Sequence, residues 1–243
     1  MRLTVLGACG AWPEAGLACS GFLLEHAGYR LLIDAGYAVA PQLLRHVDAT
    51  DVDAVYISHG HPDHCADLNP LLRARALRDE PAPPLPVYAL PGALDAVLAL
   101  DRPGMLDAAL DLHPLRPGEP LRIGPFAGEI RLLPHSRPNA GVRLTAHGEV
   151  FAYTGDAGPH PDTVELARDA DVFLAEASSV DNVPEDGTLN SAREVGRQAQ
   201  AAGVKQLILT HLLPGTDPQA AVDAATAGYD GPVRLASPSS PPR

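Results

Sequence analysis

The sequence is short of cysteine, of basic residues and of long apolar runs, and each shortage excludes a class of protein. Its three cysteines, Cys9, Cys19 and Cys65, provide no disulfide framework. Its 18 basic and 30 acidic residues give a net charge of −12, which removes any general attraction for nucleic acid or anionic membranes. No apolar run approaches the ~20 residues of a membrane span, and residues 1–7 read as a strand rather than a signal peptide. We therefore expect a cytoplasmic protein that binds neither nucleic acid nor membranes.

The composition is that of an ordinary globular protein, with 46% apolar and 20% charged residues in a chain of 243. This length allows a sizeable core, and no internal repeat or domain boundary is visible. We predict one domain over residues 1–236 and a disordered Ser/Pro-rich tail over residues 237–243. Residues 85–128 are poorly patterned and are expected to shape a substrate pocket.

Short apolar runs rich in β-branched and aromatic residues predict strands, and apolar residues at helical spacing predict helices. The predicted strands are 3–6, 22–25, 29–33, 54–57, 87–89, 130–133, 142–145, 150–153, 172–175 and 206–210. The predicted helices are 41–45, 67–78, 92–100, 191–202 and a last one that begins after Asp217. Strands come first and mixed strands and helices follow, an order that predicts two packed sheets with helices outside.

The densest chemical feature is a cluster of polar residues directly after the strand predicted at 54–57, namely His59, His61, Asp63 and His64. Imidazole and carboxylate are the usual protein ligands of zinc and similar divalent ions. Pro62 disfavours regular structure, so we expect a tight loop on which the side chains converge. The alternative is a solvated His-rich loop without function, but a buried strand rarely precedes such a loop.

Polar residues recur later in the chain in the same kind of place, the loop after an apolar strand. They are His135, Asp156, Glu176 and His211. If these strands run side by side, their ends bring the residues to one rim of the fold, where sites are usually built. Taken singly, His135 or His211 would serve equally well as a surface or capping histidine, and Asp156 as a turn aspartate. Joined to the cluster at 59–64, they supply enough ligands for two ions.

The ordered pattern resembles the metallo-β-lactamase-fold hydrolases, and most of all their tRNase Z and phosphodiesterase branch. It consists of His59-x-His61-x-Asp63-His64, His135, Thr154-Gly155-Asp156 and Thr210-His211. The first strands, with Leu32-Ile33-Asp34-Ala35-Gly36, are similar to that superfamily as well, so the resemblance covers residues 3–212. It implies an α/β fold, an αββα sandwich of two mixed β-sheets with helices on the outer faces and a dinuclear metal site at one edge.

The resemblance also implies a role for each ligand. His59, His61 and His135 would bind a first metal ion, Asp63, His64 and His211 a second, and Asp156 would bridge the two. Zinc is the default ion for such a site, and manganese and iron share its ligands.

Three side chains are candidates for catalysis or for binding the substrate. Asp63 and Glu176 are the predicted catalytic carboxylates. The resemblance implies that Glu176 hydrogen-bonds a ligand or relays a proton, and the alternative is a loop carboxylate that caps a neighbouring group. Arg143 is predicted to meet a substrate phosphate, and the alternative is a solvent-facing residue on an alternating strand.

Two departures from the pattern argue against tRNA as the substrate. In tRNase Z enzymes a His shortly before a helix partners that Glu, and residues 187–192 contain no His. The long basic arm that grips tRNA is also missing, because only residues 136–155 separate His135 from Asp156. The acidic chain agrees with a smaller substrate, since a tRNA binder normally shows a basic face.

We therefore predict a phosphodiesterase that attacks a small phosphodiester, such as a cyclic nucleotide or cyclic sugar phosphate, with a metal-bound hydroxide. The alternative is a hydrolase of a lactone, thioester or β-lactam, because that nucleophile attacks phosphorus and carbonyl carbon alike. A tRNA 3′-processing endonuclease and an inactive metal-binding protein are further alternatives. The expected partners are a small-molecule substrate and, from the resemblance, a second copy of the chain in a homodimer.

Overall fold

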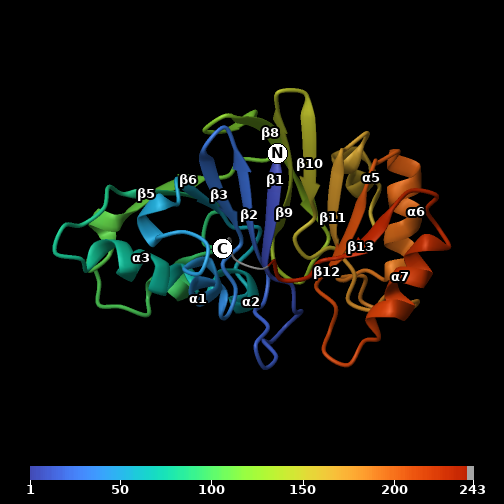
Figure 1. Ribbon diagram of the computed structural model, residues 1–243, viewed down its shortest axis with the longest axis horizontal. Helices are drawn as coiled ribbons and strands as arrows, with labels where there is room; N and C mark the ends of the chain where they lie inside the picture. Colours follow the sequence, from blue (N-terminus) through green and yellow to red (C-terminus); the bar gives the residue numbers. More distant parts are fainter. Residues whose placement is uncertain (240–243) are drawn as a thin grey trace. The chain divides into compact units, whose positions relative to one another are not determined.

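The computed structural model describes residues 1–239 and contains two mixed β-sheets with helices (Figure 1). We predicted one domain over residues 1–236, and contacts divide the chain into two compact units, each with one sheet. The first unit consists of residues 1–8 and 12–115 with the C-terminal residues from 237, and the second of residues 9–11 and 116–236. Within residues 1–239, every helix falls short of the length and hydropathy that crossing a bilayer requires.

The first unit is built on a six-stranded sheet in the order β1-β2-β3-β4-β5-β6. Its strands are β1 (Arg2–Gly7), β2 (Gly21–His26), β3 (Tyr29–Ile33), β4 (Ala54–Tyr56), β5 (Leu85–Ala89) and β6 (Leu110–Pro114). The first three strands pair antiparallel, whereas β3 to β6 run parallel. The parallel pairing of β3 with β4 brings their carboxyl ends to one edge of the sheet, and Asp34 and His59 follow those two ends.

Short helices pack on this sheet and bury its apolar side chains. They are α1 (Val39–Leu43), α2 (Pro62–Cys65), α3 (Leu68–Ala76) and α4 (Asp95–Leu98), with 3-10 turns η1 (Ala49–Asp51) and η2 (Asp107–Ala109). Leu68 and Leu72 of α3 lie one helical turn apart, and they form one core with Leu32 and Val55 of the sheet. The apolar spacing that predicted α3 therefore marks the face that the helix buries.

The second unit is built on a seven-stranded sheet in the order β13-β12-β11-β10-β9-β8-β7. Its strands are β7 (Leu121–Ile123), β8 (Phe126–Leu133), β9 (Asn139–Ala146), β10 (Glu149–Tyr153), β11 (Val172–Glu176), β12 (Leu207–Thr210) and β13 (Val233–Leu235). β10 to β13 run parallel, and β8 runs in the same direction because both β8 and β10 pair antiparallel with β9. The carboxyl ends of β8, β10, β11 and β12 therefore lie at one edge of this sheet.

Three helices belong to the second unit, and Figure 1 shows α6 and α7 beside β11, β12 and β13. They are α5 (Pro161–Ala167), α6 (Ala192–Ala202) and α7 (Pro218–Thr226). The predicted ends of α6 are confirmed, because the Ser191 side chain accepts from the Glu194 N–H and Gly203 ends the helix at a φ of 66°. Alanines of α6 and α7 pack with Phe173 and Leu207 into the core of this unit.

The structure corrects the sequence-based prediction at several places. Pro62 does not hold a loop: it stands in the first turn of α2, where a missing N–H costs nothing, so Asp63 and His64 are helical. The helix α5 and the strands β6, β7 and β13 were not predicted. Of the predicted disordered tail, Ser239 donates its N–H to Val5 O at 2.9 Å, and residues 240–243 lie outside the described residues.

Candidate metal centre

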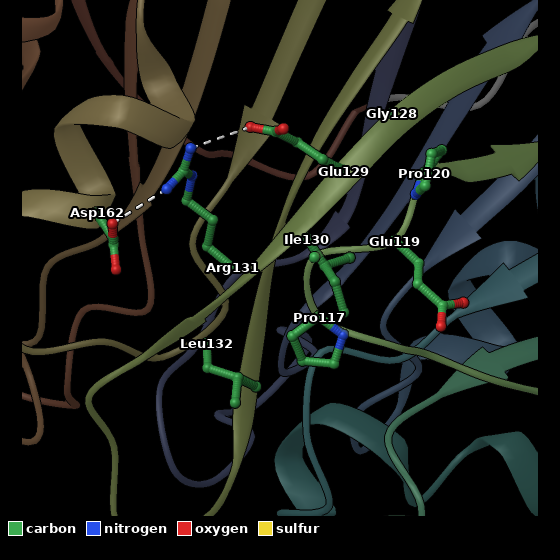
Figure 2. A pocket seen from close by; sticks show the side chains of 10 residues that line it. Pro117, Glu119, Pro120, Gly128, Glu129, Ile130, Arg131, Leu132 and Asp162 are labelled. Carbon is green, nitrogen blue, oxygen red and sulfur yellow. Dashed lines mark hydrogen bonds and ion pairs between the residues drawn. The ribbon is translucent and has the colours of Figure 1, made fainter.

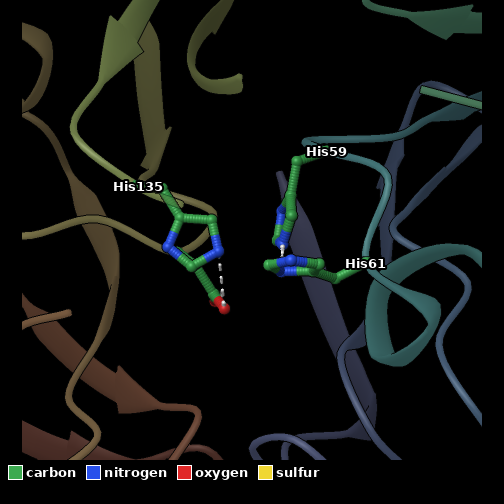
Figure 3. Close-up of side chains that lie close together, drawn as sticks. His59, His61 and His135 are labelled. Carbon is green, nitrogen blue, oxygen red and sulfur yellow. Dashed lines mark hydrogen bonds and ion pairs between the residues drawn. The ribbon is translucent and has the colours of Figure 1, made fainter. Parts of the chain in front are cut away.

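The first cluster of donor atoms lies in the first unit, where β4 ends and α2 begins. His59 Nε2 lies 3.0 Å from His61 Nδ1, and the two rings meet edge to face (Figure 3). Asp63 and His64 stand in α2, with His64 Nε2 at 3.7 Å from Asp63 Oδ2. The ring centroids of His59 and His64 are 4.2 Å apart. The predicted ligands of this unit therefore converge.

Asp34 and Ser58 orient two of these imidazoles, and all four side chains are buried. Ser58 Oγ donates to Asp34 Oδ2 at 2.8 Å and lies 3.1 Å from His59 Nδ1. Because the hydroxyl has a single proton and Asp34 receives it, Ser58 Oγ accepts from the Nδ1–H of His59. Asp34 Oδ2 also accepts from the Nδ1–H of His64 at 2.7 Å. Both imidazoles are thereby held in the tautomer whose Nε2 carries no proton and can act as a metal ligand.

The second cluster lies in the second unit, at the shared edge of β8, β10 and β12. His135 follows β8, Asp156 follows β10 and His211 follows β12. Asp156 Oδ2 lies 3.2 Å from His211 Nε2 and 3.8 Å from His135 Nε2. One carboxylate oxygen thus faces two imidazole nitrogens that come from different strands. The expectation that strand ends bring these residues to one rim is confirmed within this unit.

The imidazoles of the second cluster are also fixed through their other nitrogens. The Nδ1–H of His135 donates to Thr188 O at 2.8 Å. Ser178 Oγ donates to Glu176 Oε1, and it lies 3.5 Å from His211 Nδ1, from which it accepts. The order of carboxylate, serine and histidine in this unit repeats that of Asp34, Ser58 and His59 in the first. In both units a buried hydroxyl donates to a buried carboxylate and accepts from an imidazole, so the carboxylate fixes the tautomer of that imidazole through the hydroxyl.

The separations between donor atoms fit the coordination of a divalent ion. Zinc binds nitrogen and oxygen at about 2.0–2.2 Å, so two of its ligand atoms lie about 2.9–4.1 Å apart, depending on the angle at the metal. The four pairs, at 3.0, 3.7, 3.2 and 3.8 Å, all fall in this range. Neutral imidazoles supply no charge, and carboxylates offset that of the ions. The side chains of both clusters are therefore groups that could hold metal ions.

Glu176 is fully buried at the end of β11 and accepts hydrogen bonds at both oxygens. Its Oε1 accepts from the N–H and the hydroxyl of Ser178, and its Oε2 accepts from the Asn190 N–H at 2.8 Å. Burial, first, and the charge of Asp156, second, raise the pKa of Glu176 to about 8. The neighbouring His211 and the hydrogen bonds oppose that rise without cancelling it.

The raised pKa of Glu176 predicts that the metal-free protein loses stability as the pH rises. The folded state holds the proton up to about pH 8, whereas an unfolded Glu releases it near 4.5, so the stabilising contribution is complete below 4.5 and is lost between 4.5 and 8. We expect the free energy of unfolding, measured with urea in the presence of a chelator, to fall by up to about 1.4 kcal/mol per pH unit in this window. The variant Glu176→Gln should lack this fall.

The exposed Glu80→Gln serves as the matched control for that titration and should keep the slope of the parent protein. Metal ions beside Asp156 would cancel the charge that raises the pKa, so the metal-loaded protein should show a smaller slope. An identical pH profile for Glu176→Gln and for the parent protein would contradict the assignment.

Arg143 was predicted to meet a substrate phosphate, and the structure places its guanidinium elsewhere. The side chain leaves β9 and donates from its Nη1 to Leu166 O at 3.0 Å and to Arg168 O at 2.7 Å. Those carbonyls belong to the last turn of α5, where four such groups lack helical partners. Arg143 therefore caps a helix through its Nη1, and its contact with a substrate phosphate stays a prediction.

The sequence reasoning missed the residues that orient the ligands. Asp34 stands after β3, in the same kind of place as the ligands themselves, and that position was the signal that could have identified it. Ser58 and Ser178 had a weaker signal, because each lies within two residues of a candidate acid or histidine. Nothing in the sequence indicates that Thr188 offers its carbonyl to His135.

A separate pocket of about 500 Å³ in the second unit lies between β8 and the segment 117–120. Arg131 borders it and forms ion pairs with Glu129 and Asp162 (Figure 2). None of the predicted metal ligands lines this pocket, so its chemistry is distinct from that of the two clusters.

Comparison with known families gives one match over most of the chain. A family model described as a beta-lactamase superfamily domain matches residues 29–212. The uncharacterized protein Rv1339 of Mycobacterium tuberculosis is 37% identical over 244 residues, which span 96% of this chain and 88% of that protein. A probable metallo-hydrolase of Bacillus subtilis, YhfI, is 32% identical over 219 residues, which span 87% of each chain.

Solved structures with a similar fold agree with this family match. The crystal structure of YhfI, described as a metallo-beta-lactamase fold protein from Bacillus subtilis, superposes with a TM-score of 0.90 at 28% identity and covers 98% of this chain and 96% of that one. A diphosphatase from the PhnP family shares the fold, with a TM-score of 0.77 at 19% identity over 98% of this chain and 94% of that one.

Proposed function

Because this chain belongs to the beta-lactamase superfamily and is a metal-dependent hydrolase of the metallo-β-lactamase fold, we propose that it is a phosphodiesterase that acts on a small phosphodiester. A cyclic nucleotide or a cyclic sugar phosphate is the kind of substrate that we expect. The fold class predicted from the sequence is confirmed by the YhfI structure.

The observation that carries the proposal is the position of Asp156 between two imidazoles. Its Oδ2 lies within 3.8 Å of the Nε2 atoms of His135 and His211, which the family resemblance assigns to different ions. An oxygen in that position suits a bridging ligand, which can hold two ions at the separation of about 3.5–4 Å used by two-metal hydrolases.

We propose that the two clusters share two divalent ions, with zinc as the default and manganese or iron as the other candidates. The first ion would be held by His59, His61 and His135, the second by Asp63, His64 and His211, and both by Asp156. The donor separations and the tautomers fixed by Asp34, Ser58 and Ser178 support metal binding by these side chains.

When bound, the ions would lower the pKa of a water molecule and draw electron density from the scissile phosphoryl group. The residues of the chain do the positioning. Asp34 and Ser58 orient His64 and His59 so that the Nε2 lone pair of each ring is available to a metal ion. Glu176 orients His211 in the same way through the hydroxyl of Ser178. Since both oxygens of Glu176 are occupied by donors, we propose that it positions His211 rather than reaching the substrate.

Asp63 is the predicted catalytic carboxylate that we retain. It lies among the imidazoles of the first unit, with its Oδ2 near His64 Nε2, and it is largely buried. In that position it would act as a metal ligand, and its negative charge would offset part of the positive charge of the neighbouring ion.

The test is a panel of three substrates offered to protein loaded with zinc or manganese. We expect turnover of bis-(p-nitrophenyl) phosphate and none, or far less, of a lactone and a β-lactam. A His61→Ala variant purified in the same way controls for contaminating hydrolases and should be inactive. Turnover of the lactone or β-lactam alone would sink the proposal, and so would the absence of any turnover by fully metallated protein.

A further inference from the structure

The loop after β1 is anchored directly against His211. The Gly10 N–H donates to Leu212 O at 3.1 Å, and Cys9 forms a β-bridge with Leu212. A Cβ at Gly10 would lie 2.6 Å from His211 O and 2.9 Å from His211 Nδ1, so only glycine fits there. This loop therefore has a fixed position relative to one of the proposed metal ligands.

Two residues further on, the loop presents an indole to solvent. Trp12 is the only tryptophan of the chain and is 55% exposed. Its Cα lies within about 7.6 Å of that of Gly10, because consecutive Cα atoms are 3.8 Å apart. Ala11 between them has a φ of 62°, a strained conformation for a residue with a side chain, of the kind that clusters at functional sites. The Leu17 N–H closes the loop by donating to Glu14 O at 2.9 Å.

A second exposed aromatic side chain stands beside another proposed ligand. Tyr37 is 38% exposed and follows Gly36, whose Cβ would run into the backbone of Asp63. Within residues 1–239, the exposed large apolar side chains are aromatic at Trp12 and Tyr37 and are leucines elsewhere. Both exposed aromatic residues thus lie within two residues of a glycine that packs on a proposed ligand.

We propose that Trp12 is a specificity-determining residue that stacks on a planar heteroaromatic group of the substrate, with Tyr37 as a second aromatic surface for the same group. This inference rests on the proposed function and narrows it to phosphodiesters that carry a base. An aromatic face accepts any base without hydrogen bonds, and stacking of this kind changes affinity by about 5- to 150-fold. Because the chain is acidic and lacks a basic arm, we expect it to recognise its substrate by stacking rather than by contacts of basic side chains with phosphates.

Because Trp12 is the only tryptophan, its fluorescence reports stacking without any need for turnover. We expect adenosine monophosphate to quench the tryptophan emission of the metal-loaded protein in a saturable way, and ribose 5-phosphate, which has no base, to leave the emission unchanged. Equal effects of the two compounds, or no effect of either, would overturn the proposal. An emission that changes only with protein concentration would assign Trp12 to contact between copies of the chain and would overturn it as well.

Kinetics provide the second readout. For a cyclic adenosine phosphate, Trp12→Ala should raise KM about ten- to a hundredfold and leave kcat within a few-fold, and Trp12→Phe should restore most of the loss. The variant should treat a cyclic ribose phosphate without a base as the parent protein does. Leu77→Ala, at an exposed leucine (56% exposed), is the matched control and should change neither value.

The two proposals fail in distinguishable ways. Equal rises of KM for the substrates with and without a base would show that Trp12 only shapes the loop, and would overturn its stacking role. Quenching by adenosine monophosphate in a protein that hydrolyses no phosphodiester would support stacking and refute the phosphodiesterase. Hydrolysis of a phosphodiester without quenching by adenosine monophosphate would support the phosphodiesterase and refute stacking.

Discussion

Replacement of Asp156 by alanine is expected to lower kcat/KM by about three orders of magnitude or more and to reduce the metal content of the purified protein. The same carboxylate oxygen faces His135 and His211, so the substitution removes an anion from both proposed ions at once. Without a shared ligand, the two proposed dications would repel each other more strongly. Metal ions in such sites contribute several kcal/mol to stabilising the transition state, which corresponds to a loss of this size.

Metal analysis of protein purified without added metal is the direct measurement, together with kcat/KM on a phosphodiester. We expect about two ions per chain in the parent protein, as the two-metal proposal requires. Asp181→Ala, at an exposed aspartate of the second unit that pairs with Arg193, is the matched control and should keep both metal and activity. An Asp156→Ala protein with an unchanged metal content would refute the bridging role.

The residues of the second cluster were predictable from their position, because each follows an apolar strand. Apolar strands can be recognised from their composition, and the carboxyl ends of parallel strands lie at one edge of the sheet. His135, Asp156 and His211 follow β8, β10 and β12, and these three strands run in the same direction. A polar residue after each apolar run therefore predicted that these three side chains lie close together at one edge of the sheet.

The strands that escaped prediction share one property: each stands at the edge of its sheet. β6 closes the sheet of the first unit, and β7 and β13 close that of the second. An edge strand buries little, so its side chains need not be apolar, and it takes its register from one neighbour only. Most residues of these strands are exposed or half-exposed, and their apolar and polar residues alternate over only three to five positions, which is too short to identify a strand.

Side-chain direction was the other quantity that the sequence could not supply. Arg143 and Glu176 were both chosen as polar residues in suitable places, and their type was compatible with catalysis. The structure directs Arg143 to the carbonyls of α5 and gives Glu176 three donors of its own. The contacts of Arg143 with Leu166 and Arg168, and that of Glu176 with Asn190, join residues 14 to 25 positions apart in the chain, so no local pattern encodes them.

Replacement of Gly36 by alanine is expected to destabilise the protein by about 3 kcal/mol and to impair metal binding. A Cβ at this position would press on the Asp63 carbonyl well inside the 3.0 Å that Cβ contacts keep, and it would reach Cys19 Cβ at 3.0 Å. The neighbouring Ala35 N–H donates to His64 O at 2.7 Å, so the segment at 34–36 holds the turn that carries Asp63 and His64. Any shift that relieves the clash must therefore move α2 and two proposed ligands.

Urea unfolding of the metal-free protein measures the packing cost separately from any loss of bound metal. Gly118→Ala is the matched control, since Gly118 has a φ of 82° and nothing within 4 Å of its Cβ position. It reports the cost of the left-handed backbone alone, about 1 kcal/mol, and should leave metal content unchanged. If Gly36→Ala were no less stable than Gly118→Ala, or if it retained two ions per chain, then the segment at 34–36 would not be what positions α2.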